Sequence, residues 1–499
     1  MTHGQWRAVL GLETEYGVSA TGQVPGVAPD PISLSEAVVR AVGAAGGWHA
    51  DWNYADETPL VDARGTVLDR RVASPDLLTD VVEYANVLLG NGARVYVDHA
   101  HPEHSGPEVT SAHQAVVYDR AGDTLMQRAA ERAGAASGIT VRLYKNNSDG
   151  KGHSYGCHEN YLVPRAVPFD DIVRRFTGHL VSRVVVTGAG RVGLGPRDAR
   201  PGFQLGQRPD YFEARVGLET TVNRPIINTR DEPHADPRRY RRLHVITGDA
   251  NLSETATFVK VGAAALVLAA IADGADLPQF SDPVRAFREF SHDPTLAATA
   301  ETTSGAPMSA LEVQRRCHAA ASAVDWQVID DQEEVLGEWG LLLDDLAADP
   351  TRCADRLDWV AKLELLEGMR RRDGLDWAHP KLAAIDLQYA DLDPARGLFF
   401  ALERSGRIAR RSSDADVVRA MQQPPSGTRA WLRGRLLSRF PESVVAANWD
   451  SVTLELPRGH IINLRLTDPL GHTAALDQHL LDRAESAEQL VVLLGERRG

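Results

Sequence analysis

The pattern of hydrophobic and polar positions predicts both strands and helices. Five segments rich in valine and tyrosine, in which apolar and polar residues alternate, predict β-strands: residues 8–16, 93–98, 140–146, 159–164 and 181–187. Six segments with apolar residues at helical spacing predict α-helices: residues 33–45, 124–136, 252–272, 310–323, 333–347 and 353–372. The two kinds of segment mix irregularly, and no unit of about 20 to 50 residues repeats, as a solenoid or propeller would require. The predicted fold class is therefore α+β.

Two stretches interrupt this pattern. Residues 48–80 are rich in Asp, Pro, Arg and Gly and lack apolar periodicity, which predicts a long loop or flap beside a site. Residues 422–428 (QQPPSGT) form a break rich in Pro, Gly and Ser, after which helix and strand patterns resume. We therefore predict a large domain over residues 1–424, with a flap-like insertion at 48–80, and a small C-terminal domain over residues 425–499.

Composition narrows the class of protein. Of the 499 residues, 43% are hydrophobic and 24% are charged, as in an ordinary globular protein. The net charge of -14 argues against a general nucleic-acid binder. Three scattered cysteines without a CxxC pair indicate neither a disulfide framework nor a thiolate zinc site. The N-terminus lacks the pattern of a signal peptide, and the longest apolar run, residues 261–272, is shorter than the roughly 20 residues of a membrane span. We expect a cytoplasmic protein that binds neither nucleic acid nor membrane.

The first predicted strand carries two carboxylates on one face. In AVLGLETEYG, the period of two places Glu13 and Glu15 side by side. Neighbouring like charges raise each other's pKa unless a cation lies between them, and Mg²⁺ with oxygen ligands is such a cation. The alternative is a solvated strand end.

The second predicted strand brings an arginine, a phenol and a carboxylate together. Arg94, Tyr96 and Asp98 share one face of the segment NGARVYVDHAHPEHSGPE. A Pro-containing loop with an unusual density of histidines and carboxylates follows: His99, His101, Glu103, His104 and Glu108. The HxH pair could indicate zinc, but no HExxH motif or thiolate accompanies it. Oxygen ligands for magnesium fit this segment better.

Two further clusters have the composition of phosphate-binding segments. YKNNSDGKGHSYGCHENY is a Gly-rich loop that ends with His158 and Asn160 on one face; such loops let backbone N–H groups approach phosphate. It lacks the GxxxxGK[ST] motif, and a polar hairpin turn is the alternative. NTRDEPHADPRRYRRLHVITGDANLSE is rich in arginine, which suits bidentate binding of phosphate or carboxylate, although some of these arginines are expected to form surface ion pairs: Arg230, Arg238, Arg239, Arg241 and Arg242.

One apparent motif is rejected. Residues 188–193 (GAGRVG) match the GxGxxG pattern of dinucleotide-binding proteins and follow an apolar segment. A dinucleotide site also requires a helix directly after the glycines, whose N-terminus meets the pyrophosphate. The segment that follows, LGPRDARPGFQLGQRPDYF, does not have the pattern of such a helix.

Several motifs together resemble the family of Pup ligases and Pup deamidases/depupylases, which are relatives of glutamine synthetase. These motifs are ETEYG, NGARVYVDHAHPE, KNNSDGKGHSYGCHENYL, INTRDEPHADPRRYRRLHVITGDANLSET, IDLQYAD and PPSGTRAWLRG. The resemblance extends from about residue 8 to the C-terminus. It implies a glutamine synthetase-like fold, with a curved, mainly antiparallel β-sheet packed with helices and a small C-terminal α/β domain that contributes to the nucleotide site. It also implies ATP and Mg²⁺ as cofactors.

Within that family, the sequence resembles the hydrolase branch. It has DHAHPE where the ligase resembles DVGSHPE, SDGKGHSYG where the ligase resembles TDSAGNSYG, and an insertion at residues 48–80 without a ligase counterpart. His104 and Gly106 depart from the usual Tyr and Ala. The implied reaction is ATP- and Mg-dependent deamidation of the C-terminal Gln of Pup and cleavage of the Pup–lysine isopeptide bond, by a monomer that binds Pup and pupylated proteins. Pup ligation is the alternative, and a non-catalytic nucleotide-binding regulator is a remote one.

The resemblance also implies roles for individual residues. Asp98 matches the catalytic carboxylate. The implied metal site contains Glu13, Tyr96 and Glu103, with Glu15, Glu108 and His158 as further ligands. The implied nucleotide contacts are Arg94, Gly106, Arg241 and Trp449. The implied Pup contacts are Arg208, Arg230 and Arg238.

Overall fold

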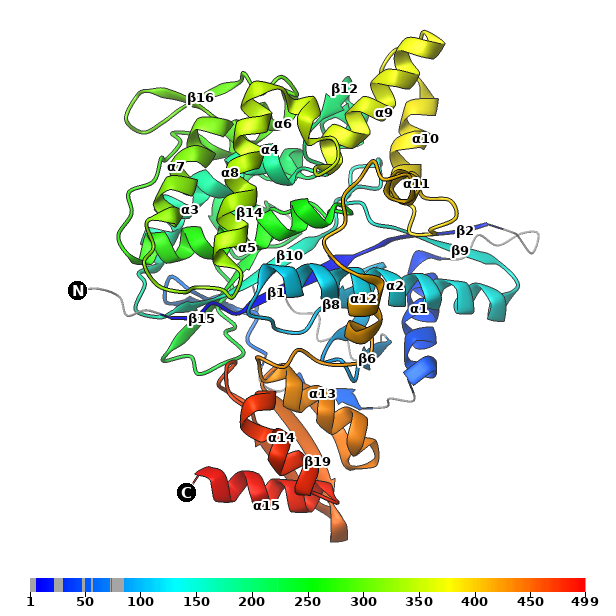
Figure 1. Ribbon diagram of the computed structural model, residues 1–499, viewed down its shortest axis with the longest axis vertical. Helices are drawn as coiled ribbons and strands as arrows, with labels where there is room; N and C mark the ends of the chain where they lie inside the picture. Colours follow the sequence, from blue (N-terminus) through cyan, green and yellow to red (C-terminus); the bar gives the residue numbers. More distant parts are fainter. Residues whose placement is uncertain are drawn as a thin grey trace.

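The computed structural model describes residues 6–21, 30–46, 50–54, 57–71, 73, 85–221 and 223–498. Its centre is a six-stranded sheet in the order β15-β10-β1-β8-β7-β6, in which every neighbouring pair is antiparallel (Figure 1). The strands are β1 (Leu10–Glu15), β6 (Asn86–Leu88), β7 (Arg94–Asp98), β8 (His101–Ser105), β10 (Cys157–Pro164) and β15 (Tyr240–Val245).

Helices cover one face of this sheet. The apolar positions of the strands, such as Leu10, Leu12 and Leu243, are buried with these helices in one core. Of the helices in this core, α2 (Ala112–Ser137) and α5 (Glu254–Ala272) contact the strands, while α3 (Phe169–Ser182), α7 (Ala310–Ser322) and α8 (Gln332–Ala348) pack against α5. The other face of the sheet is left for polar side chains.

Helix α5 is the centre of the helical layer. Ser253 caps its N-terminus by accepting a hydrogen bond from the backbone N–H of Ala256, and every residue of the helix is buried. Among the described helices it alone is long and apolar enough to cross a membrane, judged by length and composition. Because it is buried on all sides inside the protein, it has the character of a core helix.

The C-terminal part forms a second sheet, in the order β20-β19-β18-β3. Strand β3 (Asp51–Trp52) comes from the predicted insertion and pairs in parallel with β18 (Val444–Asn448). Residues of the insertion are therefore built into the C-terminal sheet, while residues 48–49, 55–56, 72 and 74–80 lie outside the described residues. The other elements of this part are α13 (Ala430–Arg439), β19 (Ser451–Leu456), β20 (His460–Arg465), α14 (Ala474–Arg483) and α15 (Ala487–Arg498).

Smaller elements surround these two sheets. Antiparallel pairs join β2 (Gly17–Thr21) to β9 (Thr140–Tyr144), β4 (Val61–Asp62) to β5 (Thr66–Val67), β11 (Arg191–Leu194) to β12 (Arg200–Gln204) and β16 (Thr299–Glu301) to β17 (Pro307–Ser309). A parallel pair joins β13 (Ala214–Gly217) to β14 (Pro225–Asn228). The remaining helices are α1 (Pro31–Gly46), α4 (Val184–Thr187), α6 (Pro283–His292), α9 (Asp358–Asp373), α10 (Pro380–Tyr389), α11 (Leu398–Arg404) and α12 (Asp414–Ala420).

The predicted α+β class is confirmed, and so are four of the five predicted strands. The strand predicted at 181–187 is wrong, because this segment contains the end of α3 and the short helix α4. Its valines are buried in the core, and tertiary packing there outweighs the β-propensity of valine. The helix predicted at 124–136 is the second half of the longer α2, and the one predicted at 353–372 begins as α-helix only at Asp358. The last three residues of GAGRVG and Leu194 form strand β11, so the helix that a dinucleotide site requires directly after the glycines does not begin here.

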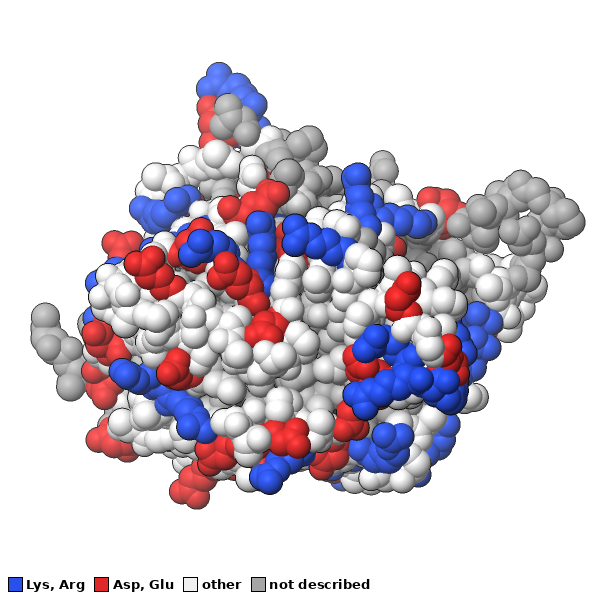
Figure 2. Space-filling view, turned by 90° about the horizontal axis from the view of Figure 1, so that it is seen from above, with Lys and Arg blue, Asp and Glu red and all other residues white. Residues whose placement is uncertain are grey.

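Charged side chains of both signs share the surface. On the face in Figure 2, Lys and Arg side chains are interspersed with Asp and Glu. The negative net charge is therefore not separated into one acidic and one basic region on this face.

Candidate functional site

The polar face of the central sheet carries a continuous band of titratable side chains. Strand pairing places Glu13 opposite His158, and Glu15 opposite Glu103. The next strand places Tyr96 opposite Glu103 and Asp98 opposite His101. Because residues two apart on a strand share a face, four strands contribute to one surface.

The first group on this surface consists of Glu13, His158 and His244, whose ligand atoms lie within 4.8 Å of one another. Nδ1 of His158 lies 3.4 Å from Oε2 of Glu13. Asn160 donates a hydrogen bond of 2.8 Å to Oε1 of Glu13. Burial alone would raise the pKa of Glu13, but the hydrogen bond to His158 and the nearby His244 and Arg242 hold it well below its usual range. Glu13 is therefore an ionised, partly buried carboxylate.

The second group consists of Glu15, Asp98 and Glu103, again with ligand atoms within 4.8 Å of one another. The backbone N–H of Gly156 donates a hydrogen bond of 2.6 Å to Oε1 of Glu15. Nε2 of His158, a member of the first group, lies 3.8 Å from that same oxygen, so the two groups are adjacent. Burial opposes ionisation of Glu15, but His101 and His158 lower its pKa to about 2.

Glu103 is the carboxylate that most clearly requires a counter-charge. Both of its oxygens are buried and have no hydrogen-bond partner among the described residues. Burial, together with the charges of Asp98, Glu15 and Glu13, raises its pKa well above the usual range. A buried carboxylate without donors is costly, and a divalent cation shared with its acidic neighbours removes that cost. The carboxylate oxygens of Glu15, Asp98 and Glu103 fit a hard divalent ion such as Mg²⁺.

Tyr96 and Arg94 form a stack beside these groups. Burial and the charges of Glu103 and Glu13 raise the pKa of Tyr96 well above its usual range, so the phenol stays protonated. The guanidinium of Arg94 lies 4.0 Å from the centre of the Tyr96 ring and 3.8 Å from that of Trp52. Trp52 in turn meets Trp449 edge to face, with ring centres 5.4 Å apart. The insertion and the C-terminal sheet thus both reach the site.

A cleft opens next to Glu13. One wall is the polar face of the central sheet, with Gly106, Asn160 and Arg242, and the opposite side is formed by Arg429 and Trp449 of the C-terminal part. The cleft therefore lies beside Glu13 and the first of the two groups.

Glu108, which the resemblance implied as a further metal ligand, has other partners. Glu108 borders the cleft, but its carboxylate accepts hydrogen bonds from Arg429 and Arg433, at 2.8 Å and 2.5 Å. These two arginines lower its pKa to about 2 against the effect of burial. Because Glu108 already pairs with two arginines, it links the segment after β8 to the start of α13. It belongs to neither of the two acidic groups.

The predicted arginines are also dispersed. Arg241 points to the helical side of the sheet, where it donates to the carbonyl of Val167, and so the structure does not bring it to the cleft. Arg208 is fully buried and donates to the carbonyl of Ile246. Arg238 is exposed and paired with Asp236, while Arg230 lies 3.8 Å from Glu232.

Two residues at the site, Asn160 and His244, were not assigned a role from the sequence, and Arg242 was noted only as one of a group of arginines that suit phosphate or carboxylate. Asn160 joins the others, because its Oδ1 lies 2.7 Å from Nη1 of Arg242 and 2.9 Å from Nδ1 of His244. The alternation of apolar and polar residues in YRRLHV (residues 240–245) could have placed Arg242 and His244 at the site. Leu243 and Val245 are apolar and must face the core, so Arg242 and His244 must face the site.

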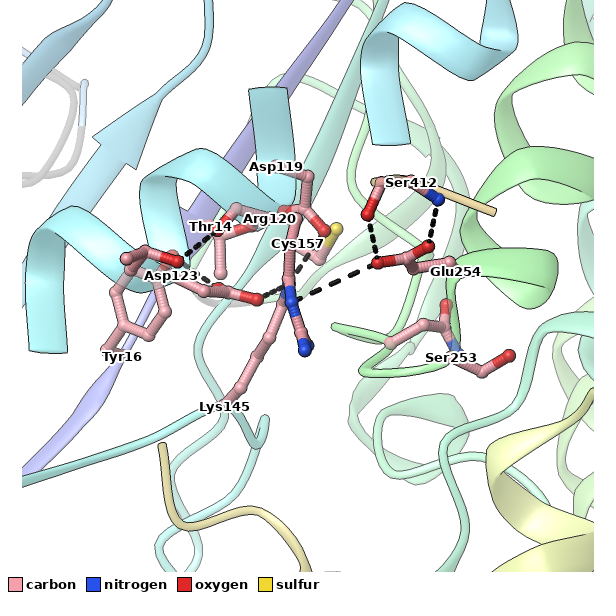
Figure 3. Close-up of polar contacts among 12 residues, drawn as sticks. Thr14, Tyr16, Asp119, Arg120, Asp123, Lys145, Cys157, Ser253, Glu254 and Ser412 are labelled. Atoms are coloured by element: carbon pink, nitrogen blue, oxygen red, sulfur yellow. Dashed lines mark hydrogen bonds and ion pairs between the residues drawn. The ribbon is translucent and has the colours of Figure 1, made fainter. Parts of the chain in front are cut away.

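A buried polar layer supports the first strand from behind (Figure 3). Nζ of Lys145 donates to Asp119 and Asp123 of α2, at 2.7 Å and 2.9 Å. Tyr16 donates to Asp123 at 2.9 Å, and Thr14 donates to Asp119 at 3.3 Å. Thr14 lies between the two carboxylates of β1, so this layer fixes the strand that carries them.

Comparison with known proteins gives consistent relatives. The family described as Pup-ligase protein matches residues 8–453. The chain is 49% identical to a depupylase of Acidothermus cellulolyticus, over 97% of this chain and 99% of that protein. It is 45% identical to a Pup deamidase/depupylase of Mycolicibacterium smegmatis, over 97% and 98% of the two chains. A Pup–protein ligase of Corynebacterium urealyticum is 38% identical, over 94% and 91%.

Solved structures agree with these relatives. The structure of a complex between Pup and its ligase PafA matches with a TM-score of 0.79 and 30% identity, over 98% of this chain and 94% of that chain. A structure of the Pup ligase PafA in complex with ADP matches with a TM-score of 0.72 and 35% identity, over 80% and 89%.

Proposed function

This chain belongs to the Pup ligase family, and we propose that it hydrolyses amide bonds at the C-terminal residue of Pup. The substrates are the C-terminal Gln amide of Pup and the isopeptide bond between Pup and a lysine. Water adds across the C–N bond, so the carbonyl carbon becomes a carboxylate, and ammonia or the lysine amine leaves. The two relatives named as depupylases are 49% and 45% identical to this chain, compared with 38% for the named ligase, which favours hydrolysis over ligation.

The observation that carries the proposal is the group formed by Glu15, Asp98 and Glu103. Of these three, Asp98 lies at the end of β7 and has a side chain that is 35% exposed, whereas Glu15 and Glu103 are buried. An accessible carboxylate next to buried ones suits a reaction with an incoming carbonyl, while the buried pair suits a metal. Mg²⁺ bound there would supply positive charge for the oxyanion of the reacting carbonyl.

Asp98 has two possible roles in this reaction. It can attack the carbonyl and form a transient anhydride, or it can remove a proton from the attacking water. Both roles require an ionised carboxylate near the bond, and both leave Glu13, Glu15 and Glu103 as metal ligands, with His158 and His244 beside them. Arg242 replaces Arg241 as the proposed contact to anionic groups, since it borders the cleft.

We place the nucleotide in the cleft between the central sheet and the C-terminal part. The ligase PafA has been solved with ADP, and the cleft residues Arg242 and Arg429 are cationic. Arg94 and Trp449 lie at the same side of the site, in the stack with Trp52. Amide hydrolysis releases free energy, so bound nucleotide need not be consumed in each turnover.

The other expectations remain predictions. They are the glutamine synthetase-like character of the sheet, the cytoplasmic location, the monomeric state and the lack of nucleic-acid or membrane partners. Pup is the proposed partner, because PafA has been solved in complex with it.

The proposal is tested by incubating the chain with ATP, Mg²⁺ and a lysine-linked Pup conjugate, and separately with Pup ending in Gln. We expect free Pup from the first substrate and ammonia from the second. In neither reaction should one molecule of ATP be converted to ADP for each bond that is cleaved. Formation of a conjugate from Pup ending in Glu and a lysine substrate, with one ADP per bond, would assign the chain to the ligases instead.

A further inference from the structure

The hairpin between β7 and β8 places a histidine against the proposed catalytic carboxylate. Asp98 ends β7 and pairs with His101, the first residue of β8, so only His99 and Ala100 form the turn. His99 has a φ of 52°, in the left-handed region that few residues other than glycine adopt and in which histidine is enriched. Nδ1 of His99 lies 2.9 Å from Oδ1 of Asp98. Successive strand residues point to opposite faces, so the turn is what lets these two side chains meet.

Asp98 needs a partner that fixes its orientation. Its ligand oxygen lies within 4.8 Å of those of Glu15 and Glu103, and these like charges repel it. The terminal torsion of an Asp side chain has a broad energy profile, so a carboxylate at a strand end is poorly fixed without a donor. An ionised carboxylate only accepts hydrogen bonds, so across this 2.9 Å distance the donor would have to be the N–H on Nδ1 of His99.

We propose that His99 is a positioning residue, which holds Oδ1 of Asp98 so that Oδ2 is presented to the substrate carbonyl or to water. The role rests on the hydrolase activity proposed above and adds a residue to it. A carboxylate held in its reactive orientation before the substrate arrives needs no reorientation in the transition state.

The surroundings of His99 separate this role from a structural one. Its side chain is 47% exposed, at the tip of a hairpin. Loss of the imidazole should therefore affect Asp98 and leave the fold intact, provided that the replacement tolerates the left-handed turn.

Two variants meet that condition. His99→Gly keeps the turn and lacks the donor, whereas His99→Asn also tolerates the left-handed region and has a side-chain N–H donor. We would measure kcat and KM for release of Pup from a lysine-linked conjugate, together with Mg-ATP affinity and Tm. We expect kcat to fall about tenfold in His99→Gly and to stay within about threefold of wild type in His99→Asn. KM, Mg-ATP affinity and Tm should stay at the wild-type values in both.

Two results would overturn the positioning role. One is a kcat of His99→Gly within about twofold of wild type, and the other is an equal loss of kcat in both variants. A wild-type chain that releases no Pup would contradict the proposed function itself, and the role of His99 would fall with it.

Discussion

Glu15 of β1 and Glu103 of β8 lie directly opposite each other in the central sheet, and both are buried. Such a pair is unfavourable without a cation, and the oxygens of Glu103 have no hydrogen-bond partner among the described residues. The arrangement therefore predicts that Mg²⁺ stabilises the folded protein. We expect Glu103→Gln and Glu13→Gln to weaken Mg-dependent ATP binding at least about tenfold by calorimetry.

A measurement of Tm separates loss of a metal ligand from general damage. Without divalent ions, Glu103→Gln should be at least as stable as wild type, because a repelled charge is gone, and its increase in Tm on addition of Mg²⁺ should be smaller. Glu455→Gln, at an exposed position of β19, is a matched control that should behave as wild type. If both site variants retain the full response to Mg²⁺, the metal site must lie elsewhere.

Glu108 should behave in the opposite way to the metal ligands. Its carboxylate pairs with Arg429 and Arg433, whose side chains are only 3% and 1% exposed. Breaking a buried pair on one side leaves uncompensated charge and costs about 3–5 kcal/mol. We expect Glu108→Gln to lower the free energy of unfolding in urea while the relative effect of Mg²⁺ on ATP affinity stays unchanged. Wild-type stability combined with loss of the Mg²⁺ effect would restore Glu108 as a metal ligand.

His104 predicts a dependence of stability on pH. Burial lowers its pKa to about 4, from 6.5. Since the unfolded chain binds the proton near pH 6.5 and the folded chain only near pH 4, the contribution is complete above pH 6.5 and is lost as the pH falls toward 4. The shift corresponds to about 3 kcal/mol. His104→Phe should remove this part of the pH dependence, whatever its effect at pH 7.5. Equal losses of stability between pH 6.5 and 4 in the two proteins would show that His104 does not contribute.

The alternation of residues predicted the core of the site. In AVLGLETEYG and ARVYVD, it placed Glu13 beside Glu15 and Tyr96 beside Asp98, and the pairing of both strands with β8 brings the two pairs to one surface. This inference needs only the strand period. It did not extend to Arg242 and His244, because no strand had been predicted at residues 240–245.

The sequence did not show which segments far apart along the chain come into contact. Glu108 follows β8 in a segment with other acidic residues and was grouped with them. Its partners lie more than 300 residues later, at the N-cap of α13 (Arg429) and inside that helix (Arg433). The run of valines near residue 184 has a strand composition and becomes helical because it is buried among α-helices. Trp52 lies in an irregular segment, and its pairing with β18 depends on the distant C-terminal sheet.

The most direct test of the account compares wild type with Asp98→Asn on a lysine-linked Pup conjugate, with ATP and Mg²⁺ present. Mass spectrometry would follow free Pup, and calorimetry would follow Mg-ATP binding in the same samples. We expect wild type to release Pup ending in Glu, and Asp98→Asn to be slower by at least about a hundredfold while it still binds Mg-ATP. Activity of Asp98→Asn within about tenfold of wild type would contradict the central role of this carboxylate.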